Sequence, residues 1–580
     1  MTEQKPRLFL GRIADDFRPG IDIASGPWVF IGAEGQVADW EKPYLDGTHP
    51  PVGALATPED RLTVYRDLDH LIRYFVGVWA DRLNARHGTD FGRGFWWTLL
   101  IRWLVAMVGA SYRRKLVLDS LMATYAERSL DLVLSDRPAD ENWDFADTQA
   151  VVNRGLLQAD FDLWLWTRLA RPVLPGNWTP VTQTIPPPEW QPPAVIGQTN
   201  AIKRLGRKLL RNLRFSDVPG FRPWECLMLS AFLAVLPAKK QGPVFRGTTP
   251  EAPPKGLAQG FVETLDDLLA ATLPRTLNED FSELGRSIEA DWFKAGKLRV
   301  TAQATTNDPG NRLLAHAIEA GEQVVRVQHG SGYGLHPGMS MNNLPEFNNR
   351  AFFSWGWTRE DAPKLVYPLP MPGFSRASPP APSDRRGGKL ILIGTKTWIR
   401  PWRLDHVPEP DQGIQYRAEK AAFVEALSPE ARSRLLYRAY ERGQSDLADR
   451  TDFAKKCPDV DFADGDLTHH LHRAALVILD HPGTTLNGNL ALDIPTICFW
   501  DPETWPLTRL GSEVFGAFSE VGMLHSSGRA AALFINEHGG EIEAWWQHPE
   551  TRAVVEEVRG LLGWGSAAWR RKWIKTLVGL

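Results

Sequence analysis

The first part of the chain is dominated by apolar positions at helical spacing. From residue 61 onward one apolar face recurs every three or four residues, through Leu68, Ile72, Phe75, Trp79 and Leu83. Residues 95–110 and 160–174 continue the helical pattern. We therefore expect a helix-rich elaboration over about residues 60–215.

Two short apolar runs precede these helices, at residues 8–11 and 28–31. Gly and Pro bound both runs, which predicts two buried strands and a sheet that begins early in the chain. The longest apolar run, residues 95–110, is shorter than the roughly 20 residues of a membrane-spanning helix and carries Arg102 at its middle. We interpret it as a buried core helix.

Prolines break the pattern at residues 172–193, PVLPGNWTPVTQTIPPPEWQPP. Because proline has no amide hydrogen to donate, this segment predicts an extended connector and neither a helix nor a central strand. Residues 201–214 follow with leucines on one helical face and basic side chains around them. Two interpretations stay open: Lys203, Arg207 and Arg211 contact an anionic lipid or a lipid-linked acceptor, or they form a plain solvated face.

Strand and helix patterns alternate from residue 297 onward. Residues 297–303 predict a strand, residues 308–321 a helix that begins at Asp308 and Pro309, and residues 323–328 a second buried strand. These three elements form a βαβ unit. Another strand is expected at residues 350–357.

A segment rich in Pro, Gly and Ser, residues 371–388, predicts a flexible linker to a second domain. Beyond it we expect a helix over residues 416–442 and four strands, at residues 389–394, near Val460, and at residues 475–480 and 495–500. The predicted fold class is α/β with two Rossmann-like domains, residues 1–370 and 389–580.

Composition narrows the partners and the compartment. The 66 Lys and Arg against 69 Asp and Glu give a net charge of -3, so no nucleic-acid partner is expected. Cys226, Cys457 and Cys498 are too few and too widely spaced for a disulfide framework or a structural zinc site, which favours a reducing compartment. The N-terminal residues lack the pattern of a secretory signal, so we expect a cytoplasmic protein.

The first candidate site is the loop VQHGSGYG. His329 lies just beyond a predicted strand, and Gly330, Gly332 and Gly334 let the backbone approach a ligand closely. An imidazole there can accept or donate a proton near neutral pH. The alternative is a turn histidine whose hydrogen bonds go to the backbone.

The second candidate site is the strand end LVILDHPGTTLNG. Asp480 and His481 end a strand, Pro482 and Gly483 turn the chain, and Thr484 with Thr485 opens a helix. A phosphate there could meet His481, the threonine hydroxyls and the helix amides together. The alternative is that Thr484 only caps the helix.

A third strand end, LILIGTKTWIRPWR, carries Thr395, Lys396, Arg400 and Arg403. These cations either steady a diphosphate or form a solvated basic loop. The sequence has no complete Walker A motif and no GxGxxG, HExxH or GxSxG motif in the relevant context, which argues against ATPase, zinc protease and α/β-hydrolase chemistry.

Several of these stretches together resemble a family of transferases associated with bacterial surface-polysaccharide gene clusters. They occur in order across nearly the whole chain: LFLG, LNARHG, FWWTLLIRWL, VQHGSGYG, FFSWGW, LDHPGTTLNGNLALDIPTICFW and EAWWQHP. More distantly, the paired strand ends are similar to those of capsule Kdo transferases and teichoic-acid glycerophosphotransferases. The resemblance implies a GT-B fold, with two Rossmann-like domains facing a cleft, and a nucleotide donor carrying a cytidine phosphate.

Two departures from the family pattern concern the candidate loops. Ser331 replaces the second glycine of QHGGxYG, which is tolerated only if its φ stays below zero. Asn487 and Asn489 stand where GT-B donor domains often carry an acid that holds ribose hydroxyls. The residue that would hold the ribose therefore stays open.

The resulting hypothesis is a glycosyltransferase that moves a sugar, such as a ulosonic acid from a CMP donor, to a glycan, lipid-linked or protein acceptor. His329 serves as base or phosphate ligand, and no cofactor or metal is expected. The candidate donor-binding residues are Gly330, Ser331, Gly332, Thr395, Lys396, His481, Pro482, Gly483, Thr484, Thr485 and Asn487. The alternatives are a CDP-polyol phosphotransferase that uses the same loops and a non-catalytic scaffold of a polysaccharide assembly complex. Membrane contact would be peripheral, on the inner face of the plasma membrane.

Overall fold

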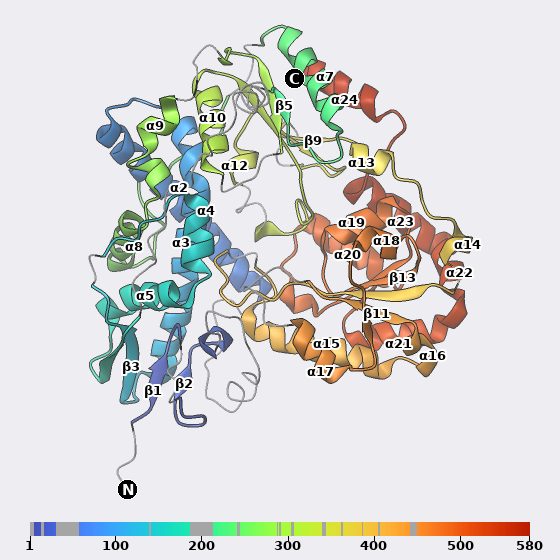
Figure 1. Ribbon diagram of the computed structural model, residues 1–580, viewed down its shortest axis with the longest axis horizontal. Coiled ribbons are helices and arrows are strands. Elements are labelled where there is room, and N and C mark those ends of the chain that lie inside the picture. The colour runs from blue at the N-terminus through green and yellow to red at the C-terminus, as the bar shows by residue number, and fades with distance from the viewer. Residues whose placement is uncertain are drawn as a thin grey trace.

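The structure is a computed structural model, and the residues that it describes form three parallel β-sheets flanked by helices (Figure 1). It describes residues 5–12, 17–30, 57–138, 141–185, 213–239, 244–286, 288, 292–302, 307–338, 344–360, 364–385, 387–403, 406–440 and 449–580. The α/β class predicted from the sequence is confirmed. Three sheets are found where two Rossmann-like halves were expected.

Sheet A is formed by the N-terminal part of the chain, with strand order β2-β1-β3-β4. Its strands are β1 (Arg7–Phe9), β2 (Ile23–Ala24), β3 (Leu130–Ser135) and β4 (Trp178–Gln183). β4 lies inside the proline-rich connector, but at the edge of the sheet, where Pro180 leaves no ladder hydrogen bond unmade.

The strand predicted at residues 28–31 is wrong. The described residues there form a 3-10 helix, η1 (Pro27–Phe30). Trp28 is nevertheless buried, because its indole nitrogen donates to the Leu10 carbonyl at 2.8 Å and its ring stacks on Trp166. The residues of the run at 28–30 are therefore apolar because this 3-10 helix is buried, and not because they pair as a strand.

The helical pattern expected from residue 61 onward is found, and the longest described helices of this part are α2 (Pro58–His87), α3 (Arg93–Tyr125) and α5 (Ala159–Ala170). The helices α3 and α5 pack against sheet A, whereas α2 packs on α3. Thr57 and Asp60 form a capping box at the start of α2, and Gly88 ends it with a φ of 63°. Among the described helices α3 alone is long and apolar enough to cross a membrane, and 94% of its apolar window is buried inside the protein. The interpretation of residues 95–110 as a core helix is confirmed.

Sheet B has its five strands in sequence order. They are β5 (Phe215–Ser216), β6 (Leu298–Thr301), β7 (Gln323–Val327), β8 (Ala351–Ser354) and β9 (Val366–Pro368). The predicted βαβ unit is confirmed: α10 (Asp308–Glu319) joins β6 to β7, with Asn307 as its N-cap and Gly321 following at a φ of 81°. The other helices of this region are α4 (Thr148–Ala150), α7 (Pro223–Val235), α8 (Gln259–Ala271), α9 (Phe281–Arg286) and α12 (Leu344–Phe347).

Sheet C has the doubly wound order β12-β11-β10-β13-β14-β15. Its strands are β10 (Lys389–Ile393), β11 (Leu435–Arg438), β12 (Asp461–Phe462), β13 (Ala474–Leu479), β14 (Thr496–Phe499) and β15 (Leu524–His525). The helix expected over residues 416–442 is shorter than predicted. α15 (Pro410–Ala426) ends before Ser428, which caps a new helix, α16 (Pro429–Ser433), and β11 then pairs with β10.

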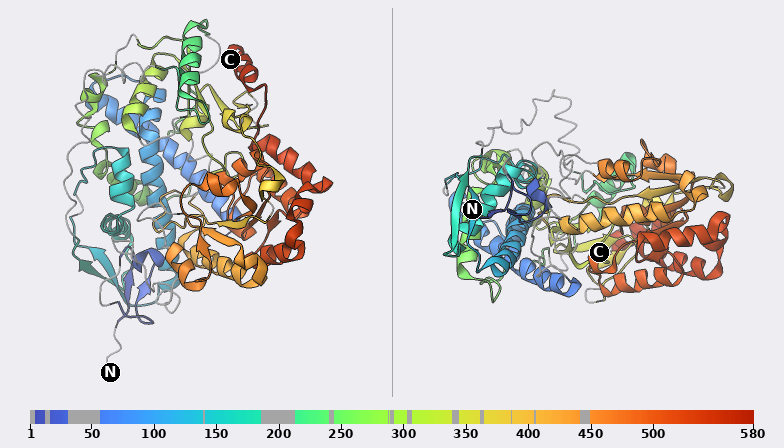
Figure 2. Two further views of the ribbon diagram at one scale, coloured as in Figure 1. Left: turned by 45° about the vertical axis from the view of Figure 1, so that its right-hand side comes forward. Right: turned by 90° about the horizontal axis from the view of Figure 1, so that it is seen from below.

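The remaining helices cover the faces and the far end of sheet C (Figure 2). They are α17 (Asp449–Lys456), α18 (Leu467–Leu471), α19 (Thr484–Ala491), α20 (Arg509–Glu520), α21 (Gly528–His538), α22 (Ile542–Gln547) and α23 (Pro549–Leu562). Sheet C and its helices, residues 389–562, are called lobe C below.

The last helix, α24 (Trp569–Gly579), leaves lobe C and packs on sheet B. Trp569, Trp573 and Leu577 are buried against that sheet, and the Trp573 indole donates to the Pro370 carbonyl at 2.8 Å. The chain therefore crosses between sheets B and C twice. The first crossing, within residues 371–388, contains α13 (Pro372–Ser375) and α14 (Pro382–Arg385). The predicted domain boundaries stay a prediction.

Candidate active site

The two predicted strand-end loops meet, although they lie 153 residues apart in sequence. The backbone N–H of Ser331, after β7, donates to the Thr484 hydroxyl at 3.1 Å, and that hydroxyl lies 3.3 Å from the Ser331 hydroxyl. β7 and β13 belong to different parallel sheets, whose carboxyl ends are where ligands bind in such folds. The contact joins the His329 and His481 loops into one candidate site.

His329 is held on one side and open on the other. Its Nε2 lies 2.7 Å from the Tyr333 hydroxyl and 3.3 Å from Glu346, while the Tyr333 hydroxyl donates to Glu346 at 2.6 Å. Since the single Tyr333 proton goes to Glu346, Nε2 carries a proton and donates, which assigns the basic lone pair of the neutral ring to Nδ1. The His329 side chain is 35% exposed. The alternative of a turn histidine bonded to backbone does not describe it.

Glu346 is a buried anion that orients this histidine. Arg102 of α3 pairs with it at 3.1 Å, and Arg326 of β7 is also buried beside it. Burial alone would raise the pKa of Glu346, but the hydrogen bond from His329 and the charges of His329, Arg102 and Arg326 bring it below its usual value. The carboxylate is therefore charged at neutral pH and can stabilise a protonated His329.

Sequence reasoning missed Glu346, Tyr333, Arg102 and Arg326 as parts of the site. Tyr333 belongs to the VQHGSGYG stretch, and Arg102 was noticed only as a charge in an apolar helix. A cation inside an apolar helix needs an anionic partner, so Arg102 could have indicated that such a partner exists. The sequence does not identify this partner, because it lies 244 residues away.

The His329 loop is fixed by Gln328. Its side-chain oxygen accepts from the Trp355 amide and the Trp357 indole at 2.9 Å each, and its amide nitrogen donates to the Gly330 carbonyl at 2.8 Å. Gly332 has a φ of 84°, which favours glycine. Ser331 is not among the non-glycine residues of positive φ in the described part of the chain, as its place in this motif requires.

In the second loop, His481 is oriented by the residue before it. Its Nδ1 lies 2.9 Å from the Asp480 carboxylate, which is fully buried, and Nε2 is left toward Gly483. A Cβ atom on Gly483 would lie 2.3 Å from that Nε2, so any other residue there would displace the ring. Behind Asp480, Lys420 lies 3.8 Å away and also pairs with Asp449.

The start of α19 is open to an anion. Its N-cap is Gly483, which makes no side-chain cap, so the alternative that Thr484 caps the helix is not what the structure has. Thr484 is instead the first helical residue, and its exposed hydroxyl meets Ser331. The first amides of a helix have no acceptor within it, and they point along its axis toward this contact.

Three other candidate donor residues are not part of the Ser331–Thr484 contact itself, although Thr395 and Lys396 follow β10, whose end pairs with the end of β13. Asn487 is buried, and its amide nitrogen donates to the Leu562 carbonyl at 2.8 Å, which ties α19 to α23. Thr395 is buried, and Lys396 lies 3.7 Å from the centre of the Trp398 ring. Arg400 is neither a diphosphate ligand nor solvated, because it is buried beside Asp162 and the Trp28 carbonyl. Lys203, Arg207 and Arg211 lie outside the described residues.

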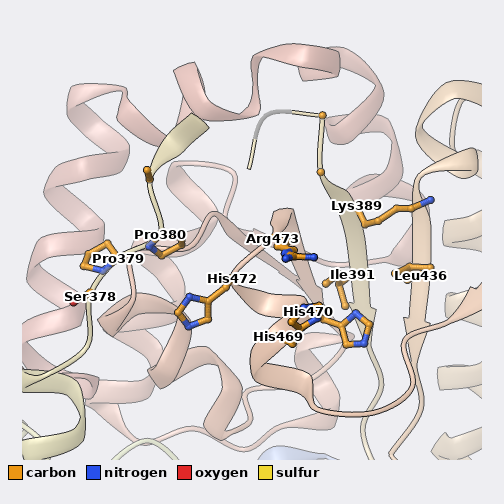
Figure 3. A pocket seen from close by; sticks show the side chains of 13 residues that line it. Ser378, Pro379, Pro380, Lys389, Ile391, Leu436, His469, His470, His472 and Arg473 are labelled. Carbon is orange, nitrogen blue, oxygen red and sulfur yellow. The ribbon is translucent and has the colours of Figure 1, made fainter. Parts of the chain in front are cut away.

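A cavity of about 920 Å³ lies at the opposite end of sheet C (Figure 3). It is bordered by Lys389 at the start of β10, Arg473 just before β13, and the histidines His469, His470 and His472. These are the amino ends of strands, whereas His329 and His481 follow carboxyl ends. The cavity is therefore not part of the candidate active site.

The family of the chain follows from a match over nearly its full length. The family described as LIC12162 family transferase matches residues 6–577. The chain belongs to this family. As a LIC12162 family transferase it is an enzyme that moves a chemical group from a donor to an acceptor.

The other comparisons add little about this transferase. No curated protein matches it. Among solved structures, it is similar to a mutant O-GlcNAc transferase of Thermobaculum terrenum, with a TM-score of 0.27 and 11% identity. That similarity covers 54% of this transferase and 59% of the other chain.

Proposed function

We propose that this enzyme is a metal-independent glycosyltransferase of GT-B type, with sheets B and C as its two Rossmann-like halves. The observation that carries the proposal is the contact between Ser331 and Thr484, which puts an oriented histidine and an open helix start in one place. A proton acceptor beside an anion site is what sugar transfer from a nucleotide donor needs.

In the proposed reaction His329 is the general base. The acceptor hydroxyl loses its proton to Nδ1 of His329, and its oxygen bonds to the anomeric carbon of the donor sugar. The bond from that carbon to the phosphate oxygen breaks, and the nucleotide leaves with the electron pair. The Glu346 carboxylate, 3.3 Å from Nε2, stabilises the imidazolium that results.

The departing phosphate is held at the start of α19. The amides there, the Thr484 and Thr485 hydroxyls and the Nε2 of His481 all lie on residues that begin or precede this helix. Asp480 accepts from Nδ1 of His481, which fixes the orientation of the ring. Gly330, Ser331 and Gly332, which follow His329 in the same loop, would lie against the same phosphate.

The substrate classes are part of the proposal. We expect a nucleotide sugar such as a CMP-linked ulosonic acid as donor, and a surface glycan, a lipid-linked glycan or a protein as acceptor. The family resemblance of the two loops supports these classes, and a cytoplasmic enzyme at the inner face of the plasma membrane would suit them.

The first experiment is a thermal-shift screen with cytidine, uridine, guanosine and thymidine mono- and diphosphates. A ligand that binds only the folded state raises its melting temperature, by an amount set by the ratio of its concentration to Kd. We expect one nucleobase series to stand out. His481→Ala should lose about tenfold or more in affinity for that nucleotide, since one charge-assisted contact is removed. His469→Ala, at the opposite end of sheet C, is the matched control.

Product analysis then decides the reaction. Transfer of a sugar leaves both phosphates, or the single phosphate of a CMP donor, on the released nucleotide, whereas polyol-phosphate transfer moves a phosphate to the acceptor. The latter product would replace the proposal by phosphotransfer at the same loops. Absence of binding by all four nucleotide series would overturn the donor site and favour the scaffold alternative.

A further inference from the structure

The helix α7 turns its apolar side to the solvent. Trp224, Leu227, Met228 and Val235 are 52%, 50%, 66% and 79% exposed, and their spacing puts them along one helical face. The two polar side chains of the helix, Glu225 and Ser230, are buried instead. This is the reverse of a helix that covers a core, in which the apolar stripe faces inward.

The helix α24 extends this apolar face. Ile574 and Val578 of α24 are 44% and 46% exposed. The helices lie side by side with their starts together and their ends together, because Arg570 pairs with Glu225 at one end and Lys239 donates to the Val578 carbonyl at the other. Figure 1 and the left view of Figure 2 show them as neighbours, at the end of the molecule that carries the C-terminus. The exposed apolar side chains of α7 and α24 are called the α7/α24 face below.

Positive charge borders the α7/α24 face. The segment from Trp569 to Leu580 carries four basic residues and no acidic one: Arg570, Arg571, Lys572 and Lys575. Arg571 and Lys575 are exposed on the same helix as Ile574 and Val578. Glu225, the acid of α7, is buried and paired with Arg376 and Arg570, so it adds no negative charge to this surface.

We propose that the α7/α24 face docks on the surface of an anionic lipid bilayer. Exposed Trp, Leu, Met, Ile and Val next to Arg and Lys match the two layers of such a surface, the acyl boundary and the negatively charged headgroups. A second copy of the chain fits less well, because a two-fold contact would bring two positively charged faces together. The proposal does not depend on the reaction proposed above.

Vesicle sedimentation tests this docking. The unaltered protein should pellet with vesicles of phosphatidylcholine and phosphatidylglycerol, should bind vesicles of phosphatidylcholine alone much more weakly, and should be released by salt. Leu227→Glu with Met228→Glu, and separately Arg571→Glu with Lys575→Glu, should each weaken the partition coefficient by about tenfold or more.

Matched controls lie on the surface of lobe C. Leu533→Glu on α21 changes a leucine that is 52% exposed, and Lys455→Glu with Lys456→Glu on α17 reverses the same number of charges. Both should bind vesicles as the unaltered protein does, and all variants should keep its melting temperature. Nucleotide binding should also be unchanged.

Four results would overturn the proposal. The first is that the unaltered protein fails to bind the anionic vesicles, the second that it binds both vesicle types equally, and the third that the α7/α24 variants bind as well as the controls. Sedimentation velocity gives the fourth: a dimer that Leu227→Glu with Met228→Glu converts to monomer assigns the face to a second copy.

Discussion

At the scale of single residues, the site depends on how one imidazole is held. Tyr333 and Glu346 occupy the Nε2 side of His329, and among the described residues no hydrogen-bond partner lies at Nδ1. A general base needs hydrogen bonds that orient it and a lone pair that these bonds do not use. Here the hydrogen bonds are at Nε2, and the lone pair of Nδ1 is left for the substrate. The negative charge of Glu346 is balanced by Arg102, which pairs with it at 3.1 Å.

His329→Ala should lower turnover about 10²-fold or more, the range for loss of a general base. The melting temperature should change little, since the His329 ring is partly exposed and is not part of a hydrophobic core. Turnover is measured with the nucleotide sugar identified by the binding screen, and His469→Ala serves as control. Near-normal turnover of His329→Ala would move the base elsewhere, and a large fall in melting temperature would make the residue structural.

Arg102→Met should destabilise the fold by about 3 kcal/mol, because it removes the 3.1 Å ion pair of a buried carboxylate. Glu346→Gln removes the other charge, and the double variant should be more stable than the sum of the two single changes predicts. Urea unfolding of the four proteins measures the coupling free energy. Additive effects would mean that the 3.1 Å pair carries no energy of its own.

At the scale of elements, Asp308 fastens the start of α10 to α4. It accepts the Thr148 amide at 2.9 Å and the Thr276 hydroxyl, and it is fully buried. Burial raises its pKa to about 6, although both hydrogen bonds act in the opposite direction. A carboxyl whose folded pKa lies above its unfolded pKa binds more protons in the folded state, so its contribution to stability falls as pH rises from about 4 to about 6.

Asp308→Asn should remove that pH dependence. Asparagine keeps an oxygen for both donors and never ionises, so relative to the unaltered protein the variant should gain up to about 3 kcal/mol between pH 4 and pH 7. Urea unfolding at several pH values measures the difference, with Asp267→Asn, whose side chain is 72% exposed, as control. A difference that does not vary with pH would show that burial does not raise the pKa of Asp308 above its unfolded value.

The sequence predicted elements best where local pattern and burial agree. The β7 and β13 strand ends were located because a short apolar run followed by Gly and Pro has one simple interpretation. The prediction failed at Trp28, where burial occurs in a turn, and at β11, where Leu435 and Tyr437 alternate at strand spacing inside a stretch that we predicted as one helix. The ion pair between Arg102 and Glu346 could not be predicted, because the sequence around each residue gives no indication that the other lies beside it in the fold.

At the scale of the whole molecule, the C-terminal helix α24 completes sheet B. Trp573 is 3% exposed among residues of β5, β6, β7 and β8, so the core of this sheet includes the end of the chain. Sheet B therefore cannot finish packing until the residues after lobe C are available.

Trp573→Ala should destabilise the protein by about 3 to 5 kcal/mol, the usual cost of removing a buried tryptophan. Thr576→Ala, a small change on the same helix, is the control and should cost less than about 1 kcal/mol. Calorimetry would show whether sheet B and lobe C unfold in one transition or two. A Trp573→Ala protein as stable as the control would mean that α24 is docked only loosely.

The double crossing between sheet B and lobe C also limits how the two can move. The Met371 amide donates to the Trp564 carbonyl at 2.9 Å, and Ser566 donates its amide to Ser375, so the two crossing segments lie side by side. Paired attachments act as a hinge: they allow rotation about one line and resist twisting or sliding. Far from this line, lobe C is held to α3 and α5 by Arg113 with Glu409 and by Arg400 with Asp162 (Figure 1). Rotation of lobe C about this line would break these two buried ion pairs. Any step of substrate exchange that needs this rotation can therefore set the rate of turnover.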